Sequence, residues 1–159
     1  MIPIERTSHI RVMIVDDHEL LRGGIRFALL TAEDIEVVAE AFRGEDAIEI
    51  CREVLPDVVL MDMRLSGELD GVSTTLALRT LCPRTQVLGI SATNEPGLVR
   101  KFIEAGALGF ITKGSSTAEL AEAIRATYRG RSTLSAESLA ALVRPLPAPE
   151  ADPVTKLTA

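Results

Sequence analysis

The sequence predicts an α/β domain built around a five-stranded parallel sheet. Short apolar runs alternate with helical patterns five times between residues 10 and 128, and this alternation is typical of βα units. The composition agrees, because 47% hydrophobic and 25% charged residues are usual for a soluble globular protein, while only 3% aromatic residues imply an aliphatic core. The 159 residues suffice for one domain of ordinary size with a segment left over.

The first half of the domain is expected to hold three strands and two helices. The apolar runs read as buried strands, and the stretches between them place apolar residues on one helical face. In the second helix, for example, Ala47, Ile48 and Cys51 share such a face. The expected elements are strand Ile10–Val15, helix Glu19–Leu30, strand Glu36–Ala41, helix Arg43–Val54 and strand Asp57–Met61.

The second half continues the same alternation. Pro96 suits the first turn of a helix and Gly106 suits its end. Ser116 or Thr117 caps the last helix, in which apolar residues recur at helical spacing from Leu120 onwards. The expected elements are a helix near Gly71–Leu81, strand Gln86–Ile90, a helix from Pro96 to about Ala105, strand Gly109–Thr112 and a helix to about Tyr128.

The composition changes after Gly130. Residues 135–143 are compatible with one more short helix, and four prolines follow closely, at Pro145, Pro147, Pro149 and Pro153. Prolines at this spacing favour an extended, semi-rigid chain. We therefore divide the chain into a domain, residues 9–130, and a segment of one short helix and a Pro-rich linker, residues 131–159.

Charge and composition argue against several classes of function. No apolar stretch approaches the roughly 20 residues that a membrane span needs, and the N-terminus has no signal-peptide core, so we expect a cytoplasmic protein without membrane contact. Cys51 and Cys82 have neither the spacing of metal ligands nor the density of a disulfide scaffold. The net charge of -6 argues against nucleic-acid binding by this chain itself, because phosphate binding needs a basic face.

Polar and charged residues follow four of the expected strands, where each strand ends. Asp16 and Asp17 follow the first strand, Asp62 the third, Ser91 the fourth and Lys113 the fifth. Ligands of open parallel sheets bind outside the carboxyl ends of the strands. Taken singly, each residue has an ordinary explanation as a helix cap, a turn residue or a solvated charge. Their joint placement at one edge favours a functional site.

The chemistry of these residues suits a phosphoryl group. A cluster of three carboxylates repels itself unless a cation neutralises it or a carboxyl pKa rises, and Mg²⁺, or alternatively Mn²⁺, prefers such oxygen ligands. Asp62 could attack a phosphoryl group to give an aspartyl phosphate. Lys113 would offset charge on one phosphoryl oxygen, Ser91 would donate a hydrogen bond to another, and the small Ala92 would leave room for the group to enter.

Four motifs carry these residues in order: Val15-Asp16-Asp17-His18, Met61-Asp62, Ile90-Ser91-Ala92 and Gly109-Phe110-Ile111-Thr112-Lys113. Together they resemble the receiver domain of bacterial two-component response regulators, over about residues 10–130. The resemblance implies a flavodoxin-like (CheY-like) doubly wound fold, with helices on both faces of a parallel sheet in the order 2-1-3-4-5.

The resemblance also implies roles in metal binding and phosphorylation. Asp62 is the expected phosphoacceptor for a sensor histidine kinase. Asp16 and Asp17 are expected to hold Mg²⁺ together with Asp62 and the backbone carbonyl of Arg64.

The remaining roles concern the response to the phosphoryl group. Ser91, with Ala92 beside it, and Lys113 are the expected switch hydroxyl and phosphate-binding lysine. Phe110 falls at the position of a rotameric aromatic, although packing of an ordinary strand aromatic explains it equally well. If Ser91 is drawn inward and Phe110 fills the vacated space, the surface formed by the last two helices and the fifth strand changes shape.

Three departures from the common family pattern are visible. Ser66 stands where a proline usually follows the phosphoacceptor, and the stretch to Gly71 is one residue longer, which predicts a looser loop. Gly114 replaces the usual proline after Lys113. Together with the Asp17-His18 pair and the stretch Gly130-Arg131-Ser132 after the last helix, it resembles the NarL/FixJ (LuxR-type) subfamily.

That subfamily implies a route to transcription regulation. In it a helix-turn-helix DNA-binding domain follows such a linker, and Leu157-Thr158-Ala159 matches the opening of that domain. We therefore expect DNA contact only through a domain absent from this chain, and a homodimer through the last helices of the receiver. The alternative is a stand-alone receiver domain with a frayed C-terminal tail.

Two other functions compete with this interpretation. Aspartyl-phosphate hydrolases of the haloacid dehalogenase type need a second Asp two positions after the nucleophile, where this chain has Arg64, so we expect slow self-hydrolysis at most and no enzyme. A pseudo-receiver that only binds partners is disfavoured because all five chemical positions are filled. His18 is expected to be a surface residue near the acidic pair and no metal ligand, and Arg100, Lys101 and Arg125 to form a solvated face.

Overall fold

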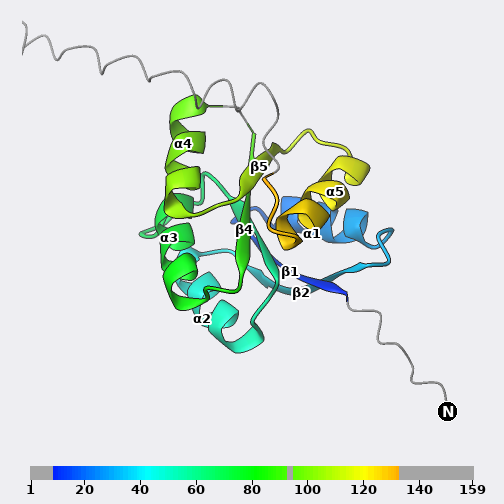
Figure 1. The fold of residues 1–159 in the computed structure, drawn as a ribbon, viewed down its shortest axis with the longest axis horizontal. Coiled ribbons are helices and arrows are strands. Elements are labelled where there is room, and N and C mark those ends of the chain that lie inside the picture. The colour runs from blue at the N-terminus through cyan, green and yellow to red at the C-terminus, as the bar shows by residue number, and fades with distance from the viewer. Residues whose placement is uncertain (1–8, 93–94, 133–159) are drawn as a thin grey trace, which may run out of the picture.

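The computed structural model of this protein describes residues 9–92 and 95–132. Five parallel strands form one sheet in the order β2-β1-β3-β4-β5 (Figure 1), which confirms the expected doubly wound topology. The elements, in chain order, are β1 (Ile10–Val15), α1 (Glu19–Leu29), β2 (Ile35–Ala41), α2 (Gly44–Val54), β3 (Val58–Asp62), α3 (Gly71–Leu81), β4 (Gln86–Ser91), α4 (Pro96–Ala105), β5 (Gly109–Thr112) and α5 (Thr117–Tyr128).

Helices cover both faces of the sheet, with α1 and α5 on one side and α2, α3 and α4 on the other (Figure 1). Because side chains of a strand alternate between faces, Val12 and Ile14 of β1 join the apolar cluster under α1 and α5, while Met13 and Val15 join the cluster under the other three helices. The central strands β3 and β4 are therefore buried on both faces, and a polar side chain on them is expected only at a strand end.

The boundaries agree with those expected to within one residue. β3 and β4 each run one residue further, so Asp62 and Ser91 are the last residues of their strands. Ser116, of the two candidates, caps α5: its hydroxyl accepts from the Glu119 N–H at 3.1 Å, and its N–H donates to the Glu119 carboxylate at 3.3 Å. The helix expected at 135–143 and the Pro-rich linker lie outside the described residues.

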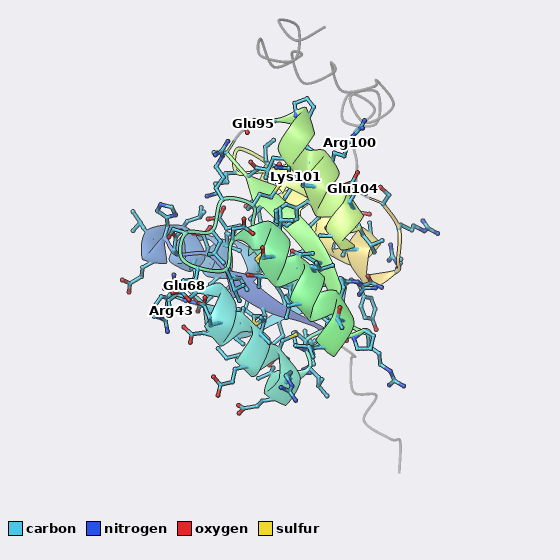
Figure 2. The ribbon with its side chains drawn as sticks, turned by 90° about the vertical axis from the view of Figure 1, so that its left-hand side faces the viewer. Arg43, Glu68, Glu95, Arg100, Lys101 and Glu104 are labelled. Carbon is cyan, nitrogen blue, oxygen red and sulfur yellow. The ribbon has the colours of Figure 1, made fainter. Side chains whose placement is uncertain are left out.

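Helix α4 has the amphipathic character that its sequence predicts. Val99, Phe102 and Ala105 are buried against the sheet, whereas Lys101 and Glu104 are exposed on the outer side of the helix (Figure 2). Across residues 9–92 and 95–132, no helix combines the length and apolarity that a membrane span requires.

Arg125 differs from its expected place on a solvated face. Its guanidinium donates twice to the carboxylate of Asp34, from Nε at 2.7 Å and from Nη2 at 2.9 Å. This ion pair joins α5 to the turn that precedes β2, because a planar guanidinium matches both oxygens of a carboxylate. Sequence spacing could not reveal the pair, since 91 residues separate its members.

Gly71 begins α3 against the backbone at the end of β3. A Cβ at this position would lie 2.4 Å from the carbonyl oxygen of Asp62 and 2.9 Å from Cζ of Phe102. We expect Gly71→Ala to lower the free energy of unfolding by roughly 1–3 kcal/mol, because overpacking forces the backbone apart. Urea denaturation measures this change. The control Gly24→Ala, in α1 with nothing within 4 Å of its Cβ, should be neutral or stabilising by up to about 1 kcal/mol; equal stability of the two variants would contradict the packing argument.

Candidate functional site

The register of the sheet brings the expected site residues together. Val15 of β1 pairs with Met61 of β3, so the residues that follow, Asp16 and Asp62, are neighbours at the carboxyl edge. The sheet order reverses between these two strands, which is where ligands of doubly wound sheets bind. On the other side of β3, β4 ends at Ser91.

Asp16 is anchored through one carboxylate oxygen. Its side chain is only 1% exposed. Oδ1 accepts a hydrogen bond from the backbone N–H of His18 at 2.8 Å, and the carbonyl of Asp16 accepts from the guanidinium of Arg22 at 2.5 Å. Oδ2 has no hydrogen-bond partner, so this buried oxygen remains available to a ligand.

Asp62 shows the same arrangement at the end of β3. Oδ1 accepts from the backbone N–H of Arg64 at 3.0 Å, whereas the buried Oδ2 lacks a hydrogen-bond partner. A buried carboxylate oxygen without a partner costs free energy. The structure thus places two such oxygens at the edge where β1 and β3 meet.

Asp17 is held by a residue from a distant loop. The hydroxyl of Ser66, in the loop between β3 and α3, donates to Oδ2 of Asp17. Burial acts to raise the pKa of Asp17, but this hydrogen bond and the nearby His18 outweigh it, so the pKa lies below its ordinary value. The loop that we expected to be looser is therefore tied to the end of β1, and Asp17 remains ionised.

Lys113 supplies a positive charge to the site. Its Nζ lies 3.7 Å from Oδ2 of Asp16 and 3.7 Å from Oδ1 of Asp62. Its backbone N–H donates to the Ser91 carbonyl at 2.7 Å, which fixes the end of β5 beside the end of β4. One ammonium does not balance three carboxylates, so the cluster keeps a negative charge.

The crowding changes the ionisation of Asp62. Burial is the main cause that raises the pKa of this carboxyl above its ordinary value, and the charges of Asp16 and Asp17 add to it. The N–H of Arg64 and the ammonium of Lys113 act in the opposite direction without cancelling the rise. Ionised Asp62 is thus under electrostatic stress that a cation would relieve.

The other expected residues lie in three different environments. Ser91 is buried at 1% exposure, and Ala92 beside it is exposed. Phe110 is buried in the apolar cluster under α2, α3 and α4 and takes no part in the carboxylate cluster. Arg64 directs its guanidinium to Glu95, the residue before α4 (Figure 2), in an ion pair that the sequence did not suggest.

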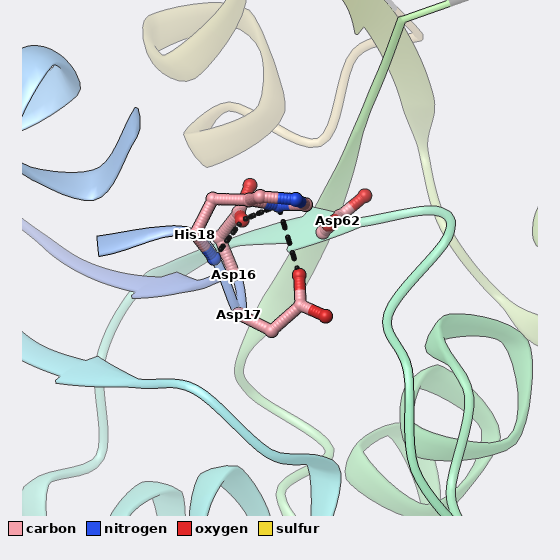
Figure 3. A group of neighbouring side chains, drawn as sticks. All are labelled: Asp16, Asp17, His18 and Asp62. Carbon is pink, nitrogen blue, oxygen red and sulfur yellow. Dashed lines mark hydrogen bonds and ion pairs between the residues drawn. The ribbon is translucent and has the colours of Figure 1, made fainter. Parts of the chain in front are cut away.

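His18 is exposed and lies beside the acidic pair, as its position in the sequence predicts. Its side chain is 67% exposed, yet Nδ1 lies 3.1 Å from Oδ1 of Asp16 and 3.0 Å from Oδ1 of Asp17 (Figure 3). The sequence held a signal for this contact, because His18 directly follows two acidic residues at a strand end. The sequence also held a signal for the contact between Ser66 and Asp17, because Ser66 stands at a position where receiver domains usually have proline.

The donor set fits a divalent cation. Asp16, Asp17, His18 and Asp62 each offer a ligand atom, and these atoms all lie within 4.8 Å of one another. Three carboxylates lie at this edge of the sheet, and each has one oxygen without a hydrogen-bond partner. They suit a hard cation such as Mg²⁺, which takes oxygen ligands and keeps part of its water shell.

Comparison with known proteins agrees with this geometry. Residues 12–125 match the family described as "Response regulator receiver domain". The chain is 39% identical over 130 residues to the response regulator protein VraR of Staphylococcus epidermidis, which covers 82% of this chain and 62% of VraR. It is 37% identical over 126 residues to the response regulator GacA of Pseudomonas viridiflava, which covers 79% of this chain and 58% of GacA. The chain therefore spans about three fifths of the length of the curated relatives it matches.

Solved structures show the same fold. The signal receiver domain described for NarL from Mycobacterium tuberculosis superposes with a TM-score of 0.74 at 39% identity, over 78% of this chain and 99% of that domain. A two-component response regulator of the LuxR family from Aurantimonas sp. SI85-9A1 superposes with a TM-score of 0.78 at 35% identity, over 85% of this chain and 96% of the other.

Removal of the Asp62 charge should stabilise the metal-free protein. Because the folded state raises the pKa of Asp62 above the unfolded value of 3.8, ionisation of this group costs stability at neutral pH and costs nothing below about pH 4. We expect Asp62→Asn in EDTA to have a higher urea midpoint than the wild type at pH 7, with the difference shrinking as the pH falls towards 4. Asp46→Asn, at an exposed ion pair with Arg43, should bring no such gain. A lower urea midpoint for Asp62→Asn than for the wild type at pH 7 would contradict the conclusion that ionised Asp62 destabilises the metal-free protein.

Proposed function

The chain belongs to the response regulator receiver domain family, of the NarL/FixJ type, and we propose that Asp62 is its phosphoacceptor and that Asp16, Asp17 and Asp62 are its Mg²⁺ ligands. Domains of this family accept a phosphoryl group and thereby control a transcriptional output. The observation that carries the residue assignment is the buried carboxylate of Asp62, which lies among further carboxylates and beside the ammonium of Lys113.

The proposed reaction transfers a phosphoryl group from a phosphohistidine of a sensor histidine kinase. A carboxylate oxygen of Asp62 forms a bond to phosphorus as the P–N bond breaks, and the electron pair of that bond stays on the histidine nitrogen, which takes up a proton. When bound, Mg²⁺ supplies positive charge to the phosphoryl oxygens, or Mn²⁺ does so in its place. Lys113 supplies further positive charge, because its Nζ already lies 3.7 Å from Asp62.

The neighbouring residues are proposed to receive and report the phosphoryl group. Ser91 donates a hydrogen bond to a phosphoryl oxygen, the small exposed Ala92 leaves the approach open, and the carbonyl of Arg64 completes the cation site. The added charge draws Ser91 inward. Phe110, now buried under α4, then repacks and changes the outer surface of α4, β5 and α5.

The aspartyl phosphate is proposed to break down slowly. A phosphatase of related chemistry needs an acid/base carboxylate two positions after the nucleophile, and this chain has Arg64 there, with its guanidinium engaged by Glu95. No general acid or base is therefore supplied at this position. We propose that the protein accepts a phosphoryl group and is not a turnover enzyme.

The output is proposed to be DNA binding by an attached domain. Residues 131–159 are then the short helix and linker that lead to a helix-turn-helix domain, since the net charge of -6 leaves this chain unsuited to phosphate backbones. We further propose that the protein is cytoplasmic. The receiver is proposed to form a homodimer through its last helices.

Phosphorylation at Asp62 can be tested with acetyl phosphate and Mg²⁺. We expect the wild type to gain about 80 Da by intact-protein mass spectrometry, the mass of one phosphoryl group replacing a proton. Asp62→Asn should show no gain because it lacks the nucleophile, and EDTA should prevent the gain in the wild type. Asp46→Asn, whose carboxylate lies in an exposed pair with Arg43, serves as control and should be phosphorylated normally. Modification of Asp62→Asn to the wild-type extent would overturn the assignment.

Ser66 should strengthen cation binding through Asp17. Its hydroxyl orients the Asp17 carboxylate, and loss of such an outer partner typically weakens metal affinity by about tenfold or more. We expect Ser66→Ala to raise the Mg²⁺ dissociation constant by roughly that factor in isothermal titration calorimetry. Ser73→Ala, at an exposed position in α3, is the matched control. An unchanged dissociation constant in Ser66→Ala would show that the Ser66 contact has no part in cation binding.

A further inference from the structure

We propose that His18 is a nitrogen ligand of the cation site, so that this site binds a borderline first-row cation such as Ni²⁺ or Zn²⁺ through its imidazole in addition to its carboxylates. The inference rests on the proposed cation site of Asp16, Asp17 and Asp62. It adds a residue and a metal preference that three carboxylates alone do not provide.

The position of Nδ1 suits a ligand atom. Adjacent ligands of an octahedral cation, bound at about 2.1 Å, are separated by about 3.0 Å. Nδ1 of His18 lies 3.1 Å from Oδ1 of Asp16 and 3.0 Å from Oδ1 of Asp17 (Figure 3). The ligand atoms of His18 and of the three aspartates all lie within 4.8 Å of one another, which one ion can span.

The backbone around His18 turns the imidazole towards the carboxylates. His18 precedes the first residue of α1 in an extended conformation, with φ -99° and ψ 105°, and its side chain makes no capping hydrogen bond. Its N–H donates to Oδ1 of Asp16 at 2.8 Å, so the start of the helix curls back over Asp16. The ring reaches the cluster from the solvent side, which leaves it free to bind without burial.

A single N–H at Nδ1 of His18 cannot form good hydrogen bonds to both carboxylate oxygens that face it. An N–H at Nδ1 donates to one acceptor well, yet two anionic oxygens face Nδ1 at nearly equal distance. A cation held by both carboxylates and by the lone pair of Nδ1 satisfies all three groups. Independently, Oδ2 of Asp16, on a side chain that is 1% exposed, has no hydrogen-bond partner and is a further donor for the ion.

The imidazole gives the site a metal preference. Imidazole nitrogen suits Ni²⁺, Cu²⁺ and Zn²⁺, with the highest affinity for Cu²⁺, whereas Mg²⁺ prefers oxygen and retains waters. His18 should therefore add much to the affinity for Ni²⁺ and little to that for Mg²⁺. This difference separates a ligand from a residue that merely orients its neighbours.

The test is calorimetric titration of the tag-free chain with MgCl₂ and with NiCl₂. We expect His18→Gln to weaken Ni²⁺ binding tenfold or more and to leave the Mg²⁺ dissociation constant within twofold of the wild type. His9→Gln is the matched control: His9 is the other histidine of the chain and precedes β1, so it lies at the opposite edge of the sheet. It should change neither constant. In the wild type, Ni²⁺ should broaden the imidazole NMR signals of His18 at lower concentrations than those of His9.

Three results would overturn the inference. Unchanged Ni²⁺ affinity in His18→Gln would leave the imidazole as a hydrogen-bond donor only. Equal losses for both ions would make His18 a positioning residue for the carboxylates. A wild type that binds neither ion would remove the proposed cation site itself, whereas Mg²⁺ binding without a His18 effect removes only this inference.

Discussion

Electrostatic repulsion among three carboxylates is the constraint on which the rest of the structure depends. The fold places Asp16 and Asp62 side by side because their strands pair in register, and Asp17 follows directly. A buried sheet edge gives these charges little water, so burial raises the pKa of Asp62 while Lys113 offsets only part of the charge. Binding of a cation relieves this repulsion, and a ligand that interacts differently with two conformations can bias the equilibrium between them.

The backbone around this cluster is built closely enough to keep the charges in place. Gly71 packs against the carbonyl of Asp62 at a distance that excludes a side chain, and Ser66 ties the same loop back to Asp17. Both contacts act on the connection between β3 and α3. Without the hydrogen bond from Ser66, the Asp17 carboxylate would lose its orientation, which would weaken its contribution to cation binding.

The strands, the helices and the strand-end residues could be predicted from the sequence, and the contacts among loops could not. Asp62 and Ser91 are recognisable because a strand covered on both faces tolerates a polar residue only at its end. Their neighbours follow from the register of parallel strands. By contrast, the partners of Ser66, Arg64 and Arg125 depend on the direction of side chains across loops, which residue spacing does not encode. The sequence placed His18 near the acidic pair, whereas the distances from its ring nitrogen to both carboxylates came only from the structure.

The ion pair between Arg125 and Asp34 bears on how the domain is made. It joins the turn before the edge strand β2 to the last helix, across 91 residues of chain. During synthesis β2 emerges from the ribosome early, whereas α5, which also covers one face of the sheet, emerges last. The apolar face that α1 and α5 share is therefore only partly covered until α5 is complete, and this long-range closure is expected to slow folding.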